Sequence, residues 1–303
     1  MNILDQLNEA YPVRRSEGEK QAFRTYVEER YGARTEITAD VKNKNLIIGD
    51  PAKARVVCTA HYDTPAASLF PNLMIPRNSF VFYLYQFLIV GVILAVAIGG
   101  GLLIGQLAGG TMEATLIGYL VLYYLIYFLA FRAFPNKRNA NDNTSGVATV
   151  LALAERYAGE DVAFILFDNE EGGKKGSRAY YKDHKDGMQN KLLINFDCVG
   201  NGEHMIFIAQ KGAEEREELI ALRAAFTPEA PYTVQFYPAK GSQCNSDHKN
   251  FPCGIGCMAC RKTRGGLFYT PYIHTGRDRV ASHKNVSYLA DRMGVFFASL
   301  RAE

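Results

Sequence analysis

The chain has 303 residues, of which 48% are hydrophobic, and it carries 34 basic and 31 acidic side chains. This composition excludes a disordered chain and allows one large core or two modest domains. The net charge of +3 is too small to indicate a nucleic-acid partner.

The N-terminal stretch MNILDQLNEAYPVRRSEGEK contains acidic residues and no apolar core, so we expect no secretory signal and no export. Beyond it, apolar runs alternate with amphipathic stretches, as in α/β proteins. Helices are predicted over residues 17–31, 144–157, 214–225 and 285–300. Strands are predicted over residues 55–60, 162–167, 192–196, 205–209, 233–237 and 256–259. Several strands are apolar on both faces, which predicts a mostly parallel mixed sheet covered by helices.

Two long apolar segments interrupt this pattern. Residues 80–112 and 114–131 contain no charged side chain, and each reaches the roughly 17 to 25 residues of a membrane-spanning helix. Neither shows the polar stripe that a soluble helix usually keeps. We therefore predict a transmembrane helical hairpin over residues 80–134, inserted into a sheet domain made of residues 1–79 and 135–303. The alternative is a pair of core helices or an oligomer interface.

The charged residues beside the hairpin predict its orientation. Arg77 precedes the first segment and Arg132, Lys137 and Arg138 follow the second, whereas the connecting turn carries only Glu113. The positive-inside rule then places both outer flanks in the cytoplasm. We expect an integral protein of the cytoplasmic membrane, with the sheet domain on the cytoplasmic side and the bilayer contacting residues 80–134. An oligomer formed through the hairpin is compatible with this arrangement.

Side chains of the types that bind metals follow several predicted strands, where an open α/β sheet places its ligands. One further acid precedes a predicted helix, and one further histidine lies late in the chain. Together the candidate residues are His61, Asp63, Asp142, Glu170, Glu171, Asp197 and His274. Histidines with carboxylates suit zinc, with manganese or cobalt as alternatives. The candidate ligands exceed the needs of one tetrahedral ion, and two ions that share a carboxylate account for the surplus. Such a pair predicts hydrolysis of an amide or ester.

The ordered motifs HYDT, ANDNTSG, EEGGKKGS, NFDCVG and IHTGRD resemble those of the clan MH zinc exopeptidases of the aminopeptidase Y and aminopeptidase S type. The stretch YPVRRSEGEKQAFRTYVEERYGA and the element SDHKNF extend the resemblance to nearly the whole chain outside the hairpin. The resemblance implies that Asp142 bridges two zinc ions, with His61 and Asp197 completing one site and Glu171 and His274 the other.

The same resemblance implies that Glu170 is the general base and that Asp63 orients His61. We therefore expect a membrane-anchored zinc metallopeptidase that acts on peptide substrates, most simply an aminopeptidase that removes N-terminal residues. One alternative is a single-zinc enzyme like the glutaminyl cyclases, which resemble this family. Another is a binding or scaffold protein that keeps the peptidase fold without catalysis.

The chain also departs from the family pattern. The link between HYDT and the DN motif is normally short, whereas here the two apolar segments intervene, so we expect the active-site mouth to face the bilayer or to be shaped by it. Lys174 stands where the family usually has leucine, and Cys198 where methionine is frequent. Residues expected to be structural, at the surface or on the substrate side are Asp247, His248, His184, His204 and His283. The six cysteines are expected to be reduced and mostly buried.

Overall fold

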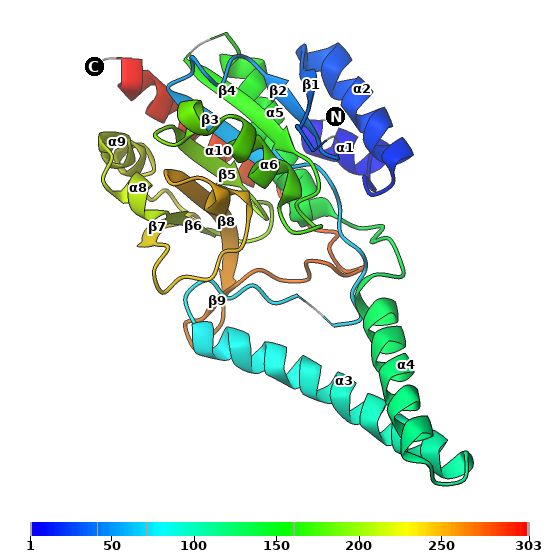
Figure 1. Cartoon of the computed structure of the whole chain (residues 1–303). Helices are drawn as coiled ribbons and strands as arrows, with labels where there is room; N and C mark the ends of the chain where they lie inside the picture. Colours follow the sequence, from blue (N-terminus) through cyan, green and yellow to red (C-terminus); the bar gives the residue numbers. More distant parts are fainter. Residues whose placement is uncertain (1, 41, 71, 160, 302–303) are drawn as a thin grey trace.

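The protein is an α/β fold with a protruding helical hairpin (Figure 1), and the computed structural model describes residues 2–40, 42–70, 72–159 and 161–301. The strands are β1 (Arg34–Ile37), β2 (Lys44–Ile48), β3 (Val56–His61), β4 (Val162–Phe167), β5 (Leu192–Phe196), β6 (His204–Ala209), β7 (Thr233–Pro238), β8 (Gly254–Lys262) and β9 (Phe268–Tyr269). The longer helices are α1 (Ile3–Ala10), α2 (Glu17–Tyr31), α3 (Ser79–Leu107), α4 (Met112–Phe131), α5 (Gly146–Tyr157), α6 (Lys175–Asp183), α9 (Glu217–Ala225) and α10 (His283–Arg301). Shorter turns of helix are η1 (Ala140–Ser145), α7 (Lys185–Met188), α8 (Lys211–Glu214) and η2 (Asp247–Asn250).

The strands form one mixed sheet in the order β1-β2-β4-β3-β5-β8-β6-β7, with β9 paired to β8. The central strands β4, β3, β5 and β8 are parallel to one another. The pairs β1–β2, β2–β4 and β6–β8 are antiparallel, and β6–β7 is parallel. The expectation of a mixed sheet is therefore confirmed, with the parallel pairs concentrated in its centre. Because the central strands run the same way, their carboxyl ends meet at one edge of the sheet.

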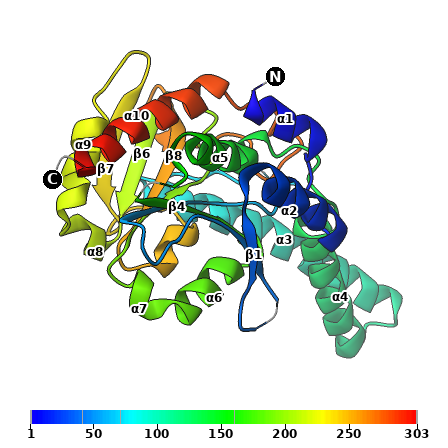
Figure 2. The same cartoon turned by 90° about the horizontal axis from the view of Figure 1, so that it is seen from above.

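Helices cover both faces of the sheet, as Figure 2 shows, with α1, α2, α5 and α10 on one face and α6 and α7 on the other. Alternate residues of β3 serve the two sides: Val56 and Cys58 join the large core with α5 and α10, whereas Val57 joins a smaller core with Tyr180 of α6. This alternation follows from the two-residue period of a strand. Burial on both faces explains why these strands are apolar along their whole length.

Most expected elements agree with the observed ones, and the differences lie in short or polar segments. The predicted helix over residues 214–225 is two helices, because α8 ends at Glu214 and α9 begins at Glu217. The guanidinium of Arg216, between them, binds the Glu218 carboxylate at 2.7 Å in the first turn of α9. The strands β1 and β2 and the helices α1 and α6 were not predicted. The edge strand β1 has no fully buried residue, so it lacks the apolar run that marks the central strands.

The two apolar segments are the helices α3 and α4, and both are long and apolar enough to cross a membrane. They meet at the far end of the hairpin and diverge toward the sheet domain (Figure 1). Most of their side chains are exposed: Phe87 and Leu107, for example, are 72% and 80% accessible. Side chains of this kind need a cover of lipid or protein.

Small residues allow α3 and α4 to pack closely where they meet. A Cβ atom on Gly101 would lie 2.8 Å from the backbone nitrogen of Tyr119 and 2.9 Å from the carbonyl oxygen of Thr115. Gly105 likewise faces Thr115, and Gly118 faces Ile104. Close backbone contact at glycine is the usual way in which membrane helices associate.

Candidate metal centre

The candidate ligands converge at the carboxyl edge of the central strands. His61 ends β3, Asp197 follows β5, and Glu170 and Glu171 lie in the turn after β4. Because β3 lies between β4 and β5 in the sheet, these groups are neighbours in space although far apart in the chain. Two further ligand candidates, Asp142 in η1 and His274 in the loop after β9, reach the same place.

Asp142 lies between two separate groups of side chains. Its Oδ1 atom is 3.4 Å from Nε2 of His61, which in turn lies 3.7 Å from Oδ1 of Asp197. Its Oδ2 atom is 3.0 Å from Nε2 of His274, which lies 3.4 Å from Oε1 of Glu171. Each group offers ligand atoms that all lie within 4.8 Å of one another. The carboxylate of Asp142 can therefore serve two cations at once, one through each oxygen.

Two asparagines fix the backbone around Asp142. Oδ1 of Asn143 accepts the backbone N–H of Cys198, and Oδ1 of Asn141 accepts that of Gly200, at 3.1 and 2.7 Å. Both bonds tie the turn of Asp142 to the loop that follows Asp197. The relative position of these two carboxylates is thus determined by buried hydrogen bonds, which are shielded from competition with water.

Asp63 contacts three other candidate residues of the site. Its Oδ1 and Oδ2 atoms accept the backbone N–H groups of Glu170 and Glu171, at 2.9 and 3.1 Å. Nδ1 of His61 lies 3.1 Å from the backbone oxygen of Asp63 and 3.6 Å from its carboxylate. The expected contact with His61 therefore runs mainly through the backbone of Asp63, because its carboxylate is occupied by the turn of Glu170 and Glu171.

Asp278 is a further acid of the site, and it was not predicted from the sequence. Its two carboxylate oxygens accept the backbone N–H groups of Asn141 and Asp142, at 3.0 and 2.9 Å. It is buried, and burial raises its pKa to about 7. The sequence offered one signal for this acid: it lies four residues after His274, within the motif IHTGRD.

The site holds more carboxyl groups than its two histidines can pair with in the charged form. Burial raises the pKa of Glu171 to about 8, although nearby His274 opposes this rise. Burial also raises the pKa of Glu170 well above its usual value. For Asp142, burial favours the neutral form, but hydrogen bonding with His274 and His61 outweighs it and lowers the pKa. A cation among these groups would favour all three carboxylates in their charged form.

Asp247 and His248 form part of η2 and are not among the candidate ligand groups of the described residues. Both are fully buried, and the Asp247 carboxylate accepts a hydrogen bond from the Ser177 hydroxyl at 2.5 Å. His248 packs against Gly256, where a Cβ atom would come within 2.6 Å of its ring. Its burial lowers its pKa to about 3, so the ring is neutral.

The positions at which the chain departs from the family pattern lie beside the site. Lys174 has a positive φ of 57°, and its Nζ donates to Oδ1 of Asn245 at 2.7 Å. Cys198 is buried and has a φ of 58°. His274 also has a positive φ, 60°, and such conformations cluster at functional sites. His184, His204 and His283 are not among the groups that could hold a metal ion in the described part of the chain, and all six cysteines are free and buried.

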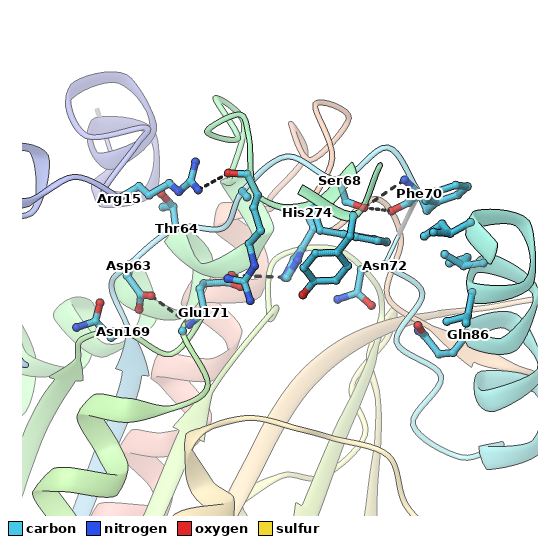
Figure 3. A pocket seen from close by; sticks show the side chains of 18 of the residues that line it. Arg15, Asp63, Thr64, Ser68, Phe70, Asn72, Gln86, Asn169, Glu171 and His274 are labelled. Atoms are coloured by element: carbon cyan, nitrogen blue, oxygen red, sulfur yellow. Dashed lines mark hydrogen bonds and ion pairs between the residues drawn. The ribbon is translucent and has the colours of Figure 1, made fainter. Parts of the chain in front are cut away.

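Two cavities adjoin the candidate ligands. The first, of about 340 Å³, is lined by all five of them together with Glu170. The second, of about 520 Å³, extends from Asp63, Glu171 and His274 to the hairpin (Figure 3). Both volumes lie in the range of ligand-binding pockets.

Comparison with known proteins identifies a family and similar folds. The sequence pattern described as peptidase family M28 matches residues 131–293. No curated protein sequence matches the chain.

Several solved structures have a similar fold. The LapA aminopeptidase of Legionella pneumophila is 14% identical, with a TM-score of 0.58 over 99% of this chain and 70% of that one. A Zn-dependent exopeptidase from Parabacteroides distasonis is 16% identical, with a TM-score of 0.55 over 97% and 94% of the two chains. The glutaminyl cyclase of Porphyromonas gingivalis is 14% identical, with a TM-score of 0.54 over 99% and 96%.

Proposed function

The chain belongs to peptidase family M28, whose pattern matches more than half of its length, and from this membership we propose that it is a membrane-anchored aminopeptidase with two zinc ions. The observation that carries the proposal is the placement of Asp142, whose two oxygens face two separate groups of ligand atoms. One ion would be held by His61, Asp142 and Asp197, and the other by Asp142, Glu171 and His274.

The donor set fits zinc. Each proposed ion has one imidazole nitrogen and two carboxylates, which are ligands that zinc accepts in catalytic sites with an open position. Oε1 of Glu171 is buried and has no hydrogen-bond partner within the described residues. A buried polar atom of this kind normally has a partner, and a cation supplies one. Manganese or cobalt suits the same oxygen-rich set.

Glu170 is the proposed general base. It lines the same cavity as the five ligands, and its backbone N–H is held by Asp63. Two zinc ions, when bound, supply polarisation of the scissile carbonyl and a lower pKa for the attacking water. Glu170 accepts a proton from that water and donates it to the amine nitrogen that leaves. Asp63 keeps Glu170 and Glu171 in place through their backbone.

A single-zinc cyclase is the second candidate, because a glutaminyl cyclase shares the fold. The two oxygens of Asp142 face His61 and His274 separately. A single ion would bind only one of these two histidines, so the arrangement favours the two-ion peptidase. A scaffold protein without catalysis is disfavoured because all five ligand candidates, Glu170 and Asp63 are present and converge.

The hairpin is the proposed membrane anchor. Residues 80–134 would form the inserted hairpin, and residues 1–79 and 135–303 the discontinuous catalytic domain. The apolar, mostly exposed surfaces of α3 and α4 support this division. Arg77 and Arg132, at the two ends of the hairpin that join the catalytic domain, support a cytoplasmic location for that domain. Contacts between hairpins offer a route to oligomers.

Metal analysis combined with a substrate panel tests the proposal. Purified full-length protein should contain two zinc ions per chain and release the first residue from peptides with a free amine, but not from acetylated ones. One ion per chain together with cyclisation of N-terminal glutamine would favour the cyclase. The anchor is tested by washing membranes with alkaline carbonate, which should leave the protein in the membrane fraction, whereas release into the wash would contradict it.

A further inference from the structure

The larger cavity beside the metal centre is walled on one side by the hairpin. Its polar end carries Asp63, Glu171 and His274 (Figure 3), and the cationic side chains of Arg15, Lys20 and Arg132 also line the cavity. Its far wall consists of side chains from the two apolar helices: Gln86, Ile89, Val90 and Ile93 of α3, and Tyr123, Tyr127 and Phe131 of α4. The spacings of three and four residues place each set on one face of its helix. Each helix thus turns one face toward the cavity.

Backbone hydrogen bonds hold this wall at a fixed place relative to the metal centre. The N–H of Ser68 donates to the carbonyl oxygen of His274 at 2.7 Å, and the N–H of the next residue, Leu69, donates to that of Ala130 in α4 at 3.0 Å. At the start of α3, the side chain of Gln243 donates to the Ser79 hydroxyl at 3.0 Å. Both ends of the hairpin are therefore attached to the loops that surround the site.

The larger cavity adjoins the smaller one that contains the ligand candidates, and it is itself lined by the candidate ligands Glu171 and His274. Four residues line both cavities: Asn72, Gln86, Glu171 and His274. A molecule in the larger cavity can therefore extend to the metal centre. The side-chain amides of Asn72 and Gln86 lie at this junction, where they can hydrogen-bond a peptide backbone.

The wall is partly exposed. Ile89 and Ile93 are buried, whereas Val90 and Tyr127 are 48% and 41% exposed. These exposed residues belong to the segments that the bilayer would surround. Part of the cavity wall is thus formed by exposed side chains of the hairpin.

We propose that the hairpin is a substrate-binding element that receives apolar peptide segments from the bilayer and directs their ends to the metal centre. This inference rests on the proposed peptidase function. An apolar segment gains from burial against Ile89, Ile93 and Phe131, whereas a charged segment loses hydration along a wall whose polar atoms are those of Gln86, Tyr123 and Tyr127. The substrate class is therefore peptides that partition into membranes, such as fragments of membrane-spanning segments.

The test compares three peptides with the same N-terminal alanine, using full-length zinc-loaded protein in phosphatidylcholine vesicles. One continues into an apolar segment of about 20 residues that inserts into the vesicle, one into a soluble Gly-Ser sequence, and one into a short soluble sequence that begins with two leucines. We expect kcat/KM for the inserted peptide to exceed both others by about tenfold or more. Equal rates for the inserted and the leucine peptide would overturn entry from the bilayer, and equal rates for all three would overturn the subsite.

Variants of α3 test whether the cavity wall causes the preference for the inserted peptide. Ile93→Trp narrows the cavity and should lower kcat/KM for the inserted peptide more than for the Gly-Ser peptide, so that the preference for the inserted peptide is lost. Val96→Trp is the matched control, because Val96 lies on the same helix, is 56% exposed and does not line the cavity. If Ile93→Trp does not fold, Val90→Gln at the exposed rim takes its place. An unchanged preference in the folded variant contradicts the proposal.

A binding measurement separates this inference from the proposed function. If the parent protein cleaves none of the peptides, the aminopeptidase proposal fails by itself. Binding of the fluorescently labelled apolar peptide to zinc-free protein in vesicles then decides the role of the hairpin. Loss of binding in Ile93→Trp but not in Val96→Trp supports the subsite, and equal binding by both overturns it.

Discussion

Asp278 and Asp142, 136 positions apart in the chain, are joined by a hydrogen bond in which Oδ2 of Asp278 accepts the backbone N–H of Asp142 at 2.9 Å. The other oxygen of Asp278 accepts the N–H of Asn141. The candidate bridging carboxylate is thus held at its backbone by a second acid that makes none of the proposed metal contacts. Metal binding should therefore depend on Asp278 as well as on the ligands themselves.

Replacing Asp278 with asparagine should weaken metal binding without removing a ligand. The amide offers one acceptor oxygen in place of two, so one of the two backbone N–H groups loses its partner. Loss of such an outer contact typically costs about 10- to 100-fold in metal affinity or activity. Zinc affinity measured by calorimetry tests this expectation. Asp291→Asn, at an exposed acid that pairs with Arg156, is the control and should bind zinc as the parent does.

Replacing Glu170 with glutamine should remove catalysis and leave the metal centre intact. The amide keeps the shape of the side chain but cannot accept the proton from water, so kcat should fall by about 10²- to 10⁴-fold. Zinc content and melting temperature should stay near those of the parent. Retention of full activity would show that another group is the base.

Removing the metal should destabilise the protein. The carboxyl groups of Glu170, Glu171 and Asp142 line one cavity, and a cation that binds only the folded state adds about 4 kcal/mol at a thousandfold excess over its Kd. A chelator should therefore lower the melting temperature, and added zinc should restore it. A chelator-independent melting temperature would contradict a metal centre at this place.

Replacing Gly101 with leucine should separate the helices of the hairpin. Its Cβ atom would meet backbone atoms of Tyr119 and Thr115 within 3 Å, and a backbone cannot move aside as a flexible side chain can. Overpacking of this kind costs about 1–3 kcal/mol. Thermal unfolding in detergent should show the loss. Gly99→Leu is the matched control, because a Cβ atom on Gly99 meets nothing within 4 Å.

Replacing Lys20 with methionine should destabilise the protein in a pH-dependent way. Lys20 and Asp168 form a buried ion pair at 2.7 Å, and burial already raises the pKa of Asp168 above its usual value despite the lysine. Without Lys20 the buried carboxylate has no cation, and breaking such a pair costs about 3–5 kcal/mol.

The sign of this pH dependence follows from the direction of the Asp168 pKa shift. A carboxyl group whose pKa is higher in the folded than in the unfolded state takes up a proton on folding, so its stabilising contribution is lost as the pH rises through the folded pKa. The gap in melting temperature between Lys20→Met and the parent should therefore be larger at pH 8 than at pH 5. Lys53→Met, at an exposed pair with Asp50, should show no such dependence, and a gap that does not change with pH would contradict the explanation.

Local patterns in the sequence were sufficient to predict the central elements. The apolar runs of β3, β4 and β5 and the amphipathic period of α2 depend only on neighbouring residues and on which face each side chain occupies. The length and composition of α3 and α4 likewise indicated two possible membrane spans. Residue types that follow strands indicated the candidate ligands, because parallel strands bring their carboxyl ends to one edge.

Contacts between distant residues were decided only by the tertiary structure. No local pattern states that Asp278 holds Asp142, that Asp63 binds the turn of Glu170 through backbone N–H groups, or that one face of α3 walls a cavity beside His274. Such contacts depend on the order of strands in the sheet and on the paths of the loops that join them. The sequence by itself thus indicated the central elements and the candidate ligands, because these depend on local patterns, whereas long-range packing decided where they meet.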